Sequence, residues 1–216
     1  MDKQQFAVIG LGRFGTSVAL ALSSQGYNVL AIDTSEQAVQ AVAKDVTHCV
    51  QADARKESVL KALGIQNLDV AIVAIGNDIE ANILITVMLK EMGIKYVVAK
   101  AQNLLHGKVL ERVGADKVVY PEKDMGVRLA YNLVSSNVMD YIELNPNYSI
   151  LEIKTPKTFA QKTLGELNLR AKYGISVLVI KNKDAIVVAP GAESRINESD
   201  ILVIIGDNDI LKKLPE

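Results

Sequence analysis

Short aliphatic runs alternate with segments of helical periodicity in the first part of this chain, and this alternation constrains the fold more than any other feature. Strands are predicted at residues 6–10, 28–33, 48–51, 70–75, 96–100 and 117–120. The segments between them repeat their apolar residues at helical spacing, which is the signature of parallel βαβ units. Runs such as VAIVAIG are apolar at every position, as a strand between two layers of helices requires. The sequence therefore predicts an α/β fold with a doubly wound parallel sheet.

Two of the helices between these strands have recognisable first residues. Thr34 is predicted to cap one of them, with Gln37 reaching back toward it, and Asp78 is predicted to begin another. The apolar face of the second helix is predicted to carry Ile79, Ile83 and Val87.

The rhythm of the chain changes after Pro121. One longer helical pattern runs over residues 123–139, and a turn-rich stretch over residues 145–147 follows it. Short strands are then predicted around a small helix near Leu164, at residues 149–154, 175–181, 185–189 and 201–206. We expect a first domain over residues 1–140, which includes the long crossover helix, and a small α+β domain over residues 145–216. Because roughly 70 residues make only a marginal core, the second domain would gain apolar burial by pairing with a copy of itself.

Charge and cysteine content exclude several classes of protein. The chain of 216 residues has 24 Lys and Arg against 25 Asp and Glu, so it has no overall positive field, and we expect no nucleic acid partner. Cys49 is the single cysteine, which precludes a disulfide within the chain and favours a reducing compartment such as the cytoplasm. No run approaches the roughly 18 uncharged residues of a membrane span, so we expect no direct membrane insertion. A membrane protein as partner is compatible with this.

The stretch IGLGRFG lies between the first predicted strand and a helix, and Gly10, Gly12 and Gly15 have the spacing G-x-G-x-x-G. In a Rossmann-like sheet the first glycine permits a tight turn, the second lets the backbone approach a pyrophosphate, and the third lets helix and sheet pack closely. The helix that follows presents free N–H groups to a phosphate. Asp33 ends the next strand, where a carboxylate accepts hydrogen bonds from ribose hydroxyls. We therefore predict a nucleotide site; the alternative is that the glycines serve helix packing alone.

The residue inside the glycine loop sharpens the choice of nucleotide. The guanidinium of Arg13 can contact phosphate oxygens in bidentate fashion, which suits a terminal phosphate better than a neutral nicotinamide ribose. The alternative is a solvated arginine at the start of a helix. Asp33 argues against NADP, because its carboxylate would repel a 2′-phosphate. ATP, ADP and NAD remain.

The sequence contains no recognisable catalyst. A dehydrogenase of this architecture would normally add a substrate domain with a proton-transfer residue, often histidine. The histidines are His48 and His106, and neither histidine nor cysteine follows Asp140. Cys49 is interpreted as a small buried hydrophobe, and the Walker-type sequence of a P-loop NTPase is absent. We expect that the protein is not an enzyme; an NAD(H)-binding redox sensor or an NAD-dependent oxidoreductase on the same fold is the alternative.

Several longer stretches carry a family resemblance: GLGRFG, AIDTSEQAV, VAIVAIGNDIEANI, VVAKAQN, VLERVGADKVVYPEKDMG, LNLRAKYGISVLVIK and SDILVIIGD. Together they resemble the RCK-domain regulatory subunits of Ktr-type and Trk-type bacterial potassium uptake systems, over essentially the whole chain. The glycine loop is common to many folds, whereas KAQN, ADKVVYPEKDMG and LRAKYG are far more specific. The resemblance implies a Rossmann-like nucleotide-binding domain followed by a small ligand-binding and dimerisation domain.

The resemblance also implies a role. Proteins of this family form homodimers that assemble into a cytosolic ring, commonly of eight subunits. The ring sits under a membrane potassium-translocating subunit and gates it according to bound ATP or ADP. The chain is therefore expected to be cytoplasmic and peripherally membrane-associated through the transporter subunit, with Mg²⁺ or another divalent cation held between subunits.

The same resemblance implies roles for single residues. Arg13 would meet the terminal phosphate of ATP, Asp33 the ribose, and Asp53, in QADA, the edge of the adenosine. Lys100, in VAKAQN, would approach the phosphates, and Glu122, in YPEKDMG, would help to hold the divalent cation. Taken alone, Glu122 is a carboxylate that stabilises the first turn of a helix. The expected nucleotide contacts are Gly10, Gly12, Arg13, Phe14, Gly15, Asp33, Asp53, Ile75, Gly76 and Lys100.

A second ligand is implied for the C-terminal domain, since proteins of this type can bind cyclic di-AMP at a dimer interface. Residues 168–175 resemble the segment that lines this pocket. Arg170 would supply the cation that two phosphates need; the alternative is an ordinary interface arginine. Ser176 stands where an asparagine often contacts the adenine in the family. The expected contacts are Leu169, Arg170, Ala171, Ile175 and Ser176.

Overall fold

The structure is a computed structural model that describes residues 4–134, 137–183, 185–211 and 213–214. Contacts within the chain divide it into two units, Met1–Pro121 and Glu122–Glu216. Among the described residues, no helix is both long enough and apolar enough to cross a membrane.

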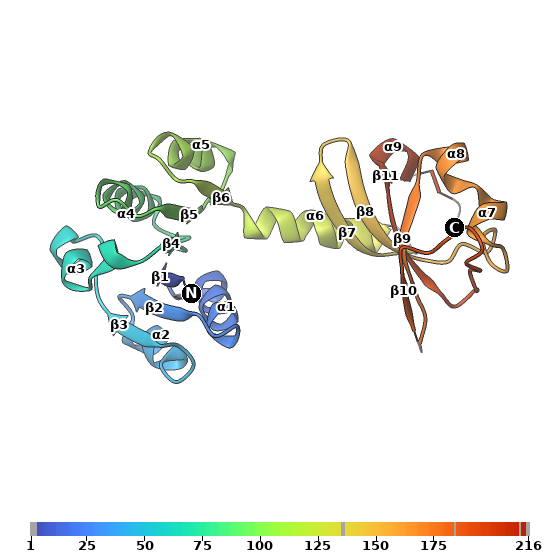
Figure 1. Cartoon of the computed structure of the whole chain (residues 1–216). Helices are drawn as coiled ribbons and strands as arrows, with labels where there is room; N and C mark the ends of the chain where they lie inside the picture. Colours follow the sequence, from blue (N-terminus) through green and yellow to red (C-terminus); the bar gives the residue numbers. More distant parts are fainter. Residues whose placement is uncertain (1–3, 135–136, 184, 212, 215–216) are drawn as a thin grey trace. The chain divides into compact units, whose positions relative to one another are not determined.

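The first unit is a six-stranded parallel sheet with helices on both faces (Figure 1). Its elements are β1 (Gln5–Ile9), α1 (Arg13–Ser24), β2 (Asn28–Asp33), α2 (Glu36–Val42), β3 (His48–Gln51), α3 (Glu57–Ala62), η1 (Ile65–Asn67), β4 (Val70–Val73), α4 (Ile79–Glu91), β5 (Tyr96–Lys100), α5 (Leu104–Arg112) and β6 (Lys117–Val119). The strand order is β3-β2-β1-β4-β5-β6. The chain therefore starts in the middle of the sheet, adds β2 and β3 on one side, and then returns to add β4, β5 and β6 on the other side. The predicted doubly wound, Rossmann-like sheet is confirmed.

Neighbouring residues of one strand feed two separate cores, one on each face of this sheet. In β4, Ala71 and Val73 belong to the core that also receives side chains from α3, α4 and α5. Ile72 belongs to the core that receives side chains from α1 and α2. The continuous apolar run around β4 is therefore explained, because both faces of the strand are covered.

Helix α2 begins one residue later than predicted. Its cap is Ser35 and not Thr34, since the hydroxyl of Ser35 accepts a hydrogen bond from the N–H of Ala38. The cause is Asp33, whose carboxylate accepts a hydrogen bond from the N–H of Ser35 at 2.8 Å. Thr34 becomes part of the turn, where its carbonyl oxygen accepts a hydrogen bond from the side chain of Gln51.

Helix α4 begins as predicted but buries a different face. The carboxylate of Asp78 accepts a hydrogen bond from the N–H of Ala81 at 2.9 Å, which confirms the predicted start. The predicted face is wrong in part, because Ile79 is exposed, whereas Ile83 is half-buried and packs against the core. The helix packs against both β5 and α5, so it buries a broad stripe. This stripe consists of Ala81, Asn82, Ile85, Thr86, Met88 and Leu89.

The second unit is built on a five-stranded antiparallel sheet with the order β10-β9-β11-β8-β7 (Figure 1). Its elements are α6 (Pro121–Val134), β7 (Val138–Asn145), β8 (Tyr148–Lys154), α7 (Leu164–Leu167), α8 (Leu169–Tyr173), β9 (Ser176–Lys181), β10 (Ile186–Val188), β11 (Ile201–Asp207) and α9 (Asn208–Leu211). A single core lies on one face of this sheet, with Ile153, Leu202 and Ile204 almost fully buried. The predicted small α+β fold is confirmed.

The long helix α6 ends earlier than predicted, and β7 starts within the stretch that was predicted to be helical up to residue 139. Residues 135–136 lie outside the described part of the chain. Tyr131 of α6 stacks on Tyr141 of β7 with ring centroids 4.0 Å apart, and Arg128 pairs with Asp140. These contacts tie α6 to the second sheet, whereas the sequence pattern grouped this helix with the first domain. Residues 146–147 form the turn of the hairpin between β7, which ends at Asn145, and β8.

Candidate functional site

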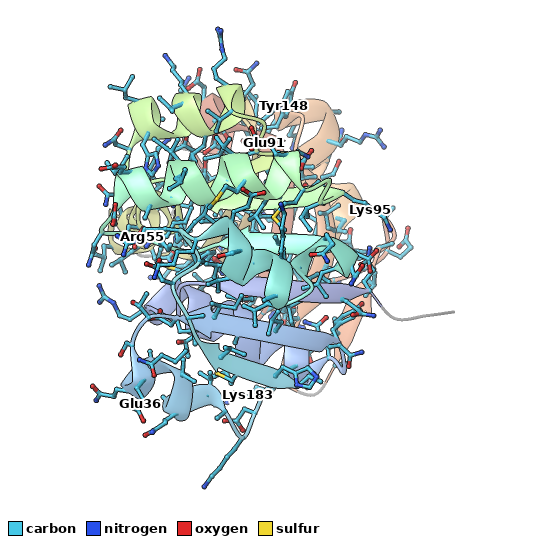
Figure 2. All side chains as sticks on the ribbon, turned by 90° about the vertical axis from the view of Figure 1, so that its left-hand side faces the viewer. Glu36, Arg55, Glu91, Lys95, Tyr148 and Lys183 are labelled. Carbon is cyan, nitrogen blue, oxygen red and sulfur yellow. The ribbon has the colours of Figure 1, made fainter. Side chains whose placement is uncertain are left out.

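The predicted nucleotide contacts of the first unit follow the carboxyl ends of its parallel strands. The glycine loop follows β1, Asp33 ends β2, Asp53 follows β3, Gly76 follows β4 and Lys100 ends β5. Figure 2 shows the two edges of the sheet, with Glu36 and Arg55, which follow β2 and β3, at one edge and Lys95, which precedes β5, at the other. The carboxyl edge beside a switch in strand order is where open α/β sheets bind ligands, and this sheet switches between β1 and β4.

Two of the loop's glycines are required by the fold itself. Gly10 has a φ of +95°, and a Cβ added there would lie 3.0 Å from Cγ1 of Ile75. A Cβ on Gly15 would lie 1.9 Å from the carbonyl oxygen of Gly10, so helix α1 can approach the loop this closely only with glycine there. These positions would need glycine whether or not a ligand binds.

Gly12 has no such requirement within the chain. Its φ of −68° is open to any residue, and a Cβ built on it meets nothing within 4 Å. Gly12 is also the cap residue of α1, and no side chain caps the helix there. A side chain at Gly12 would therefore point into open space, and the first turn of α1 has no side-chain cap. This arrangement fits a phosphate group, which helix N-termini bind through their free N–H groups.

Asp33 has a structural role that the sequence did not reveal. Its Oδ2 accepts a hydrogen bond from the N–H of Leu11 at 2.6 Å, and its Oδ1 accepts one from the N–H of Ser35. The carboxylate thus fixes the glycine loop to the end of β2. This places it beside the loop, where the ribose was predicted, and the ribose contact stays a prediction.

Lys100 lies close to Phe14 and Gly76, two other residues of the predicted set. Its Nζ is 5.9 Å from the centroid of the Phe14 ring, and a Cβ on Gly76 would lie 3.2 Å from the same Nζ. Arg13 is exposed in the first turn of α1, and within the described part of the chain no carboxylate pairs with it. Both cations are therefore at the same edge of the sheet as the open N-terminus of α1.

Asn82 is a residue of this edge that the sequence reasoning missed. It is fully buried in α4, and its side-chain Nδ2 donates hydrogen bonds to the carbonyl oxygens of Ile75 and Lys100. The signal was an asparagine in the apolar run ANILIT, where a polar side chain must find partners inside the protein.

Asp53 lies at the same edge, but its carboxylate is engaged. Nε of Arg55 is 2.9 Å from Oδ1 and Nη2 is 2.9 Å from Oδ2, and this bidentate contact holds the pKa of Asp53 below its usual range. Asp78 and Glu80, at the start of α4, also act on Arg55 and help to keep its pKa raised. A contact of Asp53 with an adenosine, which stays a prediction, would share the carboxylate with Arg55.

The single cysteine has the character of a packed thiol. Cys49 is half-buried, and its Sγ is 3.2 Å from the carbonyl oxygen of Val39. Burial raises the pKa of the thiol, and the nearby charge of Asp33 raises it further. A raised pKa keeps the thiol protonated at neutral pH, and a protonated thiol is a poor nucleophile.

Glu122 lies in the first turn of α6, together with Asp124. Within the described residues, no group of three or more His, Cys, Asp and Glu side chains is arranged to hold a metal ion. One copy of the described chain therefore does not complete the predicted divalent cation site, and Glu122 could contribute to it only alongside ligands from elsewhere.

The second unit contains a hollow of about 400 Å³ where the cyclic di-AMP contacts were predicted. Four of the five predicted residues line it, and Ala171 does not. The chain reaches this hollow through Asn168, whose backbone is left-handed (φ +45°) at the junction of α7 and α8. The lining residues are Leu164, Gly165, Asn168, Leu169, Arg170, Ile175, Ser176, Val177, Pro190, Gly191 and Ala192.

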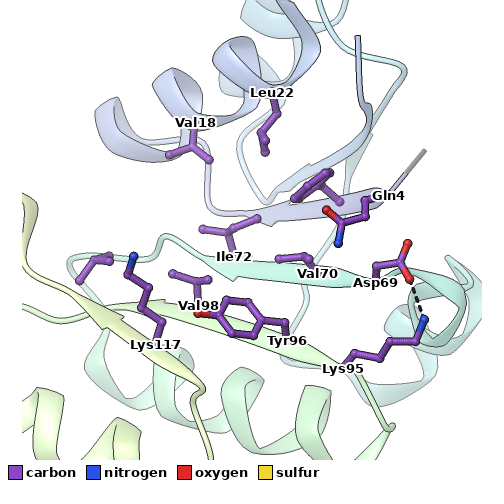
Figure 3. A pocket seen from close by; sticks show the side chains of 12 residues that line it. Gln4, Val18, Leu22, Asp69, Val70, Ile72, Lys95, Tyr96, Val98 and Lys117 are labelled. Atoms are coloured by element: carbon purple, nitrogen blue, oxygen red, sulfur yellow. Dashed lines mark hydrogen bonds and ion pairs between the residues drawn. The ribbon is translucent and has the colours of Figure 1, made fainter. Parts of the chain in front are cut away.

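A groove of about 630 Å³ lies on the face of the first sheet beside α1 (Figure 3). Val18 and Leu22 of α1 form one side, and residues of β1, β4, β5 and β6 form the floor. At the rim Asp69 pairs with Lys95 at 2.8 Å. None of the predicted nucleotide contacts lines this groove, so it is separate from the candidate nucleotide site.

Comparisons with known proteins agree with this architecture. Residues 6–121 match the TrkA-N domain and residues 149–215 match the TrkA-C domain. The chain is 49% identical over 204 residues to Ktr system potassium uptake protein C of Bacillus subtilis (strain 168), covering 94% of this chain and 92% of the relative. It is 47% identical over 213 residues to Ktr system potassium uptake protein A of the same organism, covering 99% and 96%.

A solved structure shares the fold over nearly the whole chain. The GsuK channel bound to NAD matches with a TM-score of 0.68 at 18% identity, covering 97% of this chain. The present chain spans 38% of the length of that channel, and the likeness is one of fold.

Proposed function

Because this chain belongs to the family of Ktr potassium uptake proteins built from a TrkA-N and a TrkA-C domain, we propose that it is a regulatory subunit that gates a membrane potassium transporter according to whether ATP or ADP is bound. It would act in the cytoplasm and reach the membrane through its translocating partner. The nucleotide would be sensed rather than consumed.

The observation that carries the proposal is the open position at Gly12. Gly10 and Gly15 are explained by packing, whereas nothing in the chain excludes a side chain at Gly12, so a group from outside the chain has room to approach there. That group would meet the uncapped first turn of α1, where backbone N–H groups favour an anion. A nucleotide phosphate is the anion that this loop geometry suits.

Arg13 supports ATP and ADP over NAD. Without a carboxylate partner in the described structure, its guanidinium is available for an exposed phosphate, with which it can form two parallel hydrogen bonds. NAD stays an alternative ligand, because the GsuK channel, which shares this fold, is described as bound to NAD. A fold alone does not fix the ligand, so the choice depends on binding measurements.

The proposed mechanism is mechanical. ATP and ADP would both bind at the carboxyl edge of the sheet, but the terminal phosphate of ATP would make contacts that ADP lacks. A ligand shifts an equilibrium between two ring shapes only by its difference in affinity for them, so this difference in contacts is what would bias the transporter. Hydrolysis is not required for such a bias.

Assembly with further copies is supported by exposed apolar residues. Met125, Leu129 and Leu133 recur along one face of α6 and are exposed by 58%, 55% and 76%. An exposed apolar stripe of this kind is typical of an interface, and the groove of the first sheet, lined in part by apolar residues, is the surface that we propose for it on a second copy. We propose that homodimers form through these surfaces and close into a ring of eight subunits.

Two further ligands belong to the proposal. Cyclic di-AMP would bind in the hollow of the second unit, with Arg170 against its phosphates, and would act as a second site coupled to the first. Mg²⁺ or another divalent cation would be held by Glu122 together with ligands from another copy, since one described chain supplies no complete set.

The first experiment is calorimetry with ATP, ADP and NADH, each with and without Mg²⁺. Tight binding of ATP and ADP with weak binding of NADH is the expected result. The second experiment is potassium flux through the reconstituted transporter complex with the variant Arg13→Ala. We expect this variant to lose the response to ATP, whereas Arg112→Ala, an exposed arginine in the last turn of α5, should keep it. NADH as the tightest ligand, or an unchanged response in Arg13→Ala, would overturn the proposal.

A further inference from the structure

Asn82 is a polar side chain at one of the most protected positions of the first unit. It is 0% exposed, and the buried residues of the same helix are otherwise apolar except Thr86. Burying an amide without hydrogen-bond partners would lower the stability of the fold. The hydrogen bonds of Asn82 therefore show why a polar side chain is tolerated at this position.

Both hydrogens of the amide are used: one goes to the loop after β4 and the other to the end of β5. Nδ2 of Asn82 donates to the carbonyl oxygen of Ile75 at 2.7 Å and to the carbonyl oxygen of Lys100 at 2.9 Å. Only the nitrogen of the amide can donate, so two carbonyl partners fix its orientation. Oδ1 is buried and has no hydrogen-bond partner in the described structure. The side chain thus serves these two carbonyl groups.

The two carbonyl groups belong to the walls of the candidate nucleotide site. Ile75 lies in the loop after β4 and packs against Gly10, because a Cβ on Gly10 would lie 3.0 Å from Cγ1 of Ile75. Lys100 ends β5, and its Nζ lies close to Gly76. One buried amide therefore joins the loop that packs against Gly10 to the end of the strand that carries Lys100.

We infer that Asn82 is a positioning residue of the nucleotide site, which holds the loop after β4 and the end of β5 at the separation that a phosphorylated ligand requires. This inference rests on the proposed binding of a nucleotide. Asn82 is fully buried and does not touch the ligand; it acts through Ile75 and Lys100. Removing the amide would remove the two hydrogen bonds that connect these carbonyl groups, and the loop and the strand end would be free to separate.

The adjoining turn of α4 provides a matched control. Thr86 is also 0% exposed, and its hydroxyl donates to the carbonyl oxygen of Asn82 at 2.8 Å, within the same helix. Thr86→Val keeps the shape of the side chain and removes a buried hydrogen bond, but it leaves the loop after β4 joined to the end of β5. Comparing Thr86→Val with Asn82→Leu distinguishes two causes of weaker binding. One is the loss of any buried hydrogen bond in α4, and the other is the loss of the connection between the loop after β4 and the end of β5.

The test compares dissociation constants for ATP, ADP and adenosine by calorimetry. For Asn82→Leu we expect affinities for ATP and ADP to fall at least tenfold, while the affinity for adenosine, which has no phosphate, changes less than twofold. Thr86→Val should bind all three as the unchanged protein does. Equal losses for ATP and adenosine, or no loss for either, would overturn the inference.

A double substitution tests whether Asn82 acts through Lys100. If it does, adding Asn82→Leu to Lys100→Gln should cost less ATP affinity than adding it to the unchanged protein, and full additivity would count against the link. If Asn82→Leu does not fold, Asn82→Ser replaces it, because its short hydroxyl cannot reach both carbonyl groups. Failure of the unchanged protein to bind any nucleotide would refute the proposed function itself, whereas binding that is indifferent to Asn82 would refute this inference alone.

Discussion

The two candidate ligand sites of this protein differ in whether backbone groups or side chains form them. At the carboxyl edge of the first sheet, the site consists largely of backbone: a glycine loop, the open first turn of α1, and a loop and a strand end joined by a buried amide. In the second unit the site is a hollow lined by side chains from two short helices, the start of β9 and residues 190–192. A site made of backbone depends on the absence of side chains, and a site made of side chains depends on their identity.

This difference determines how each site can be broken. In the first unit a single added methyl group can disrupt either the fold or the ligand, depending on which glycine receives it. In the second unit a truncated side chain removes one contact and leaves the fold intact. The predictions below use this contrast, and the largest expected effect comes first.

Gly15→Ala is expected to have the largest effect, and the effect is on stability. The added Cβ would lie 1.9 Å from the carbonyl oxygen of Gly10, so α1 must move away from the loop. We expect the free energy of unfolding to fall by about 3 kcal/mol or more. Urea unfolding followed by circular dichroism measures this, and a loss below about 1 kcal/mol would contradict the packing argument.

Gly12→Ala is expected to lower nucleotide affinity and to leave stability almost unchanged. The added Cβ meets nothing, and alanine is a poorer helix cap than glycine but reduces the entropy of the unfolded chain, so stability should change by less than about 1 kcal/mol. ATP and ADP affinity should fall by about tenfold to a hundredfold, because the methyl group stands where the phosphate approaches. Calorimetry on a variant with an unchanged urea midpoint tests this. Unchanged affinity would mean that the ligand does not lie against Gly12.

Arg170→Ala is expected to affect the second unit alone. Arg170 is exposed and lines the hollow, so its loss should lower cyclic di-AMP affinity about tenfold without changing the urea midpoint. Lys172→Ala, on the same short helix but outside the hollow, is the control. Equal effects of the two variants would mean that net positive charge, and not the hollow, attracts the ligand.

The smallest effect concerns pH and should be confined to the first unit. His106 is 3% exposed, its Nδ1 accepts a hydrogen bond from the N–H of Gln102, and burial lowers its pKa. Stability from the neutral ring is complete above the ordinary pKa of about 6.5 and is lost as the pH falls from there through the lower folded pKa. The sequence of the second unit contains no histidine.

Urea unfolding near pH ~7.5 and near pH ~5 compares the unchanged protein with His106→Gln. The unchanged protein should lose more stability on acidification than the variant does. His48→Gln, at an exposed strand end, should behave as the unchanged protein. An identical loss in all three proteins would show that His106 does not contribute to the pH dependence.

Much of the fold followed from local patterns. The six parallel strands were predicted because each is a short aliphatic run, and the cap at Asp78 was predicted because its side chain bonds to a residue three positions away. The second sheet was predicted except for β7, whose first two residues fell at the end of the predicted helix over residues 123–139. That error has a physical reason. Tyr131 and Tyr141 are ten residues apart in the sequence, and a periodic pattern does not reveal that their rings stack.

Some features of the candidate site could likewise be predicted from the sequence, and others could not. The glycine loop was recognisable because its three glycines have a fixed spacing between a strand and a helix, and Arg13 stood inside it. The engagement of Asp53 by Arg55, and the role of Asp33 in fixing the loop, needed coordinates because they depend on how a side chain turns once the chain is folded.

The sequence by itself determined the parallel sheet, the glycine loop, the balance of charge and the resemblance to potassium uptake proteins. Periodicity, residue type and spacing are properties of neighbours along the chain, so they can be read before folding. Only the tertiary structure decided which glycine has open space beside it, that Asn82 joins the loop after β4 to the end of β5, and that α6 packs with the second sheet. These depend on atoms that lie far apart in the sequence and meet only when the sheet has formed.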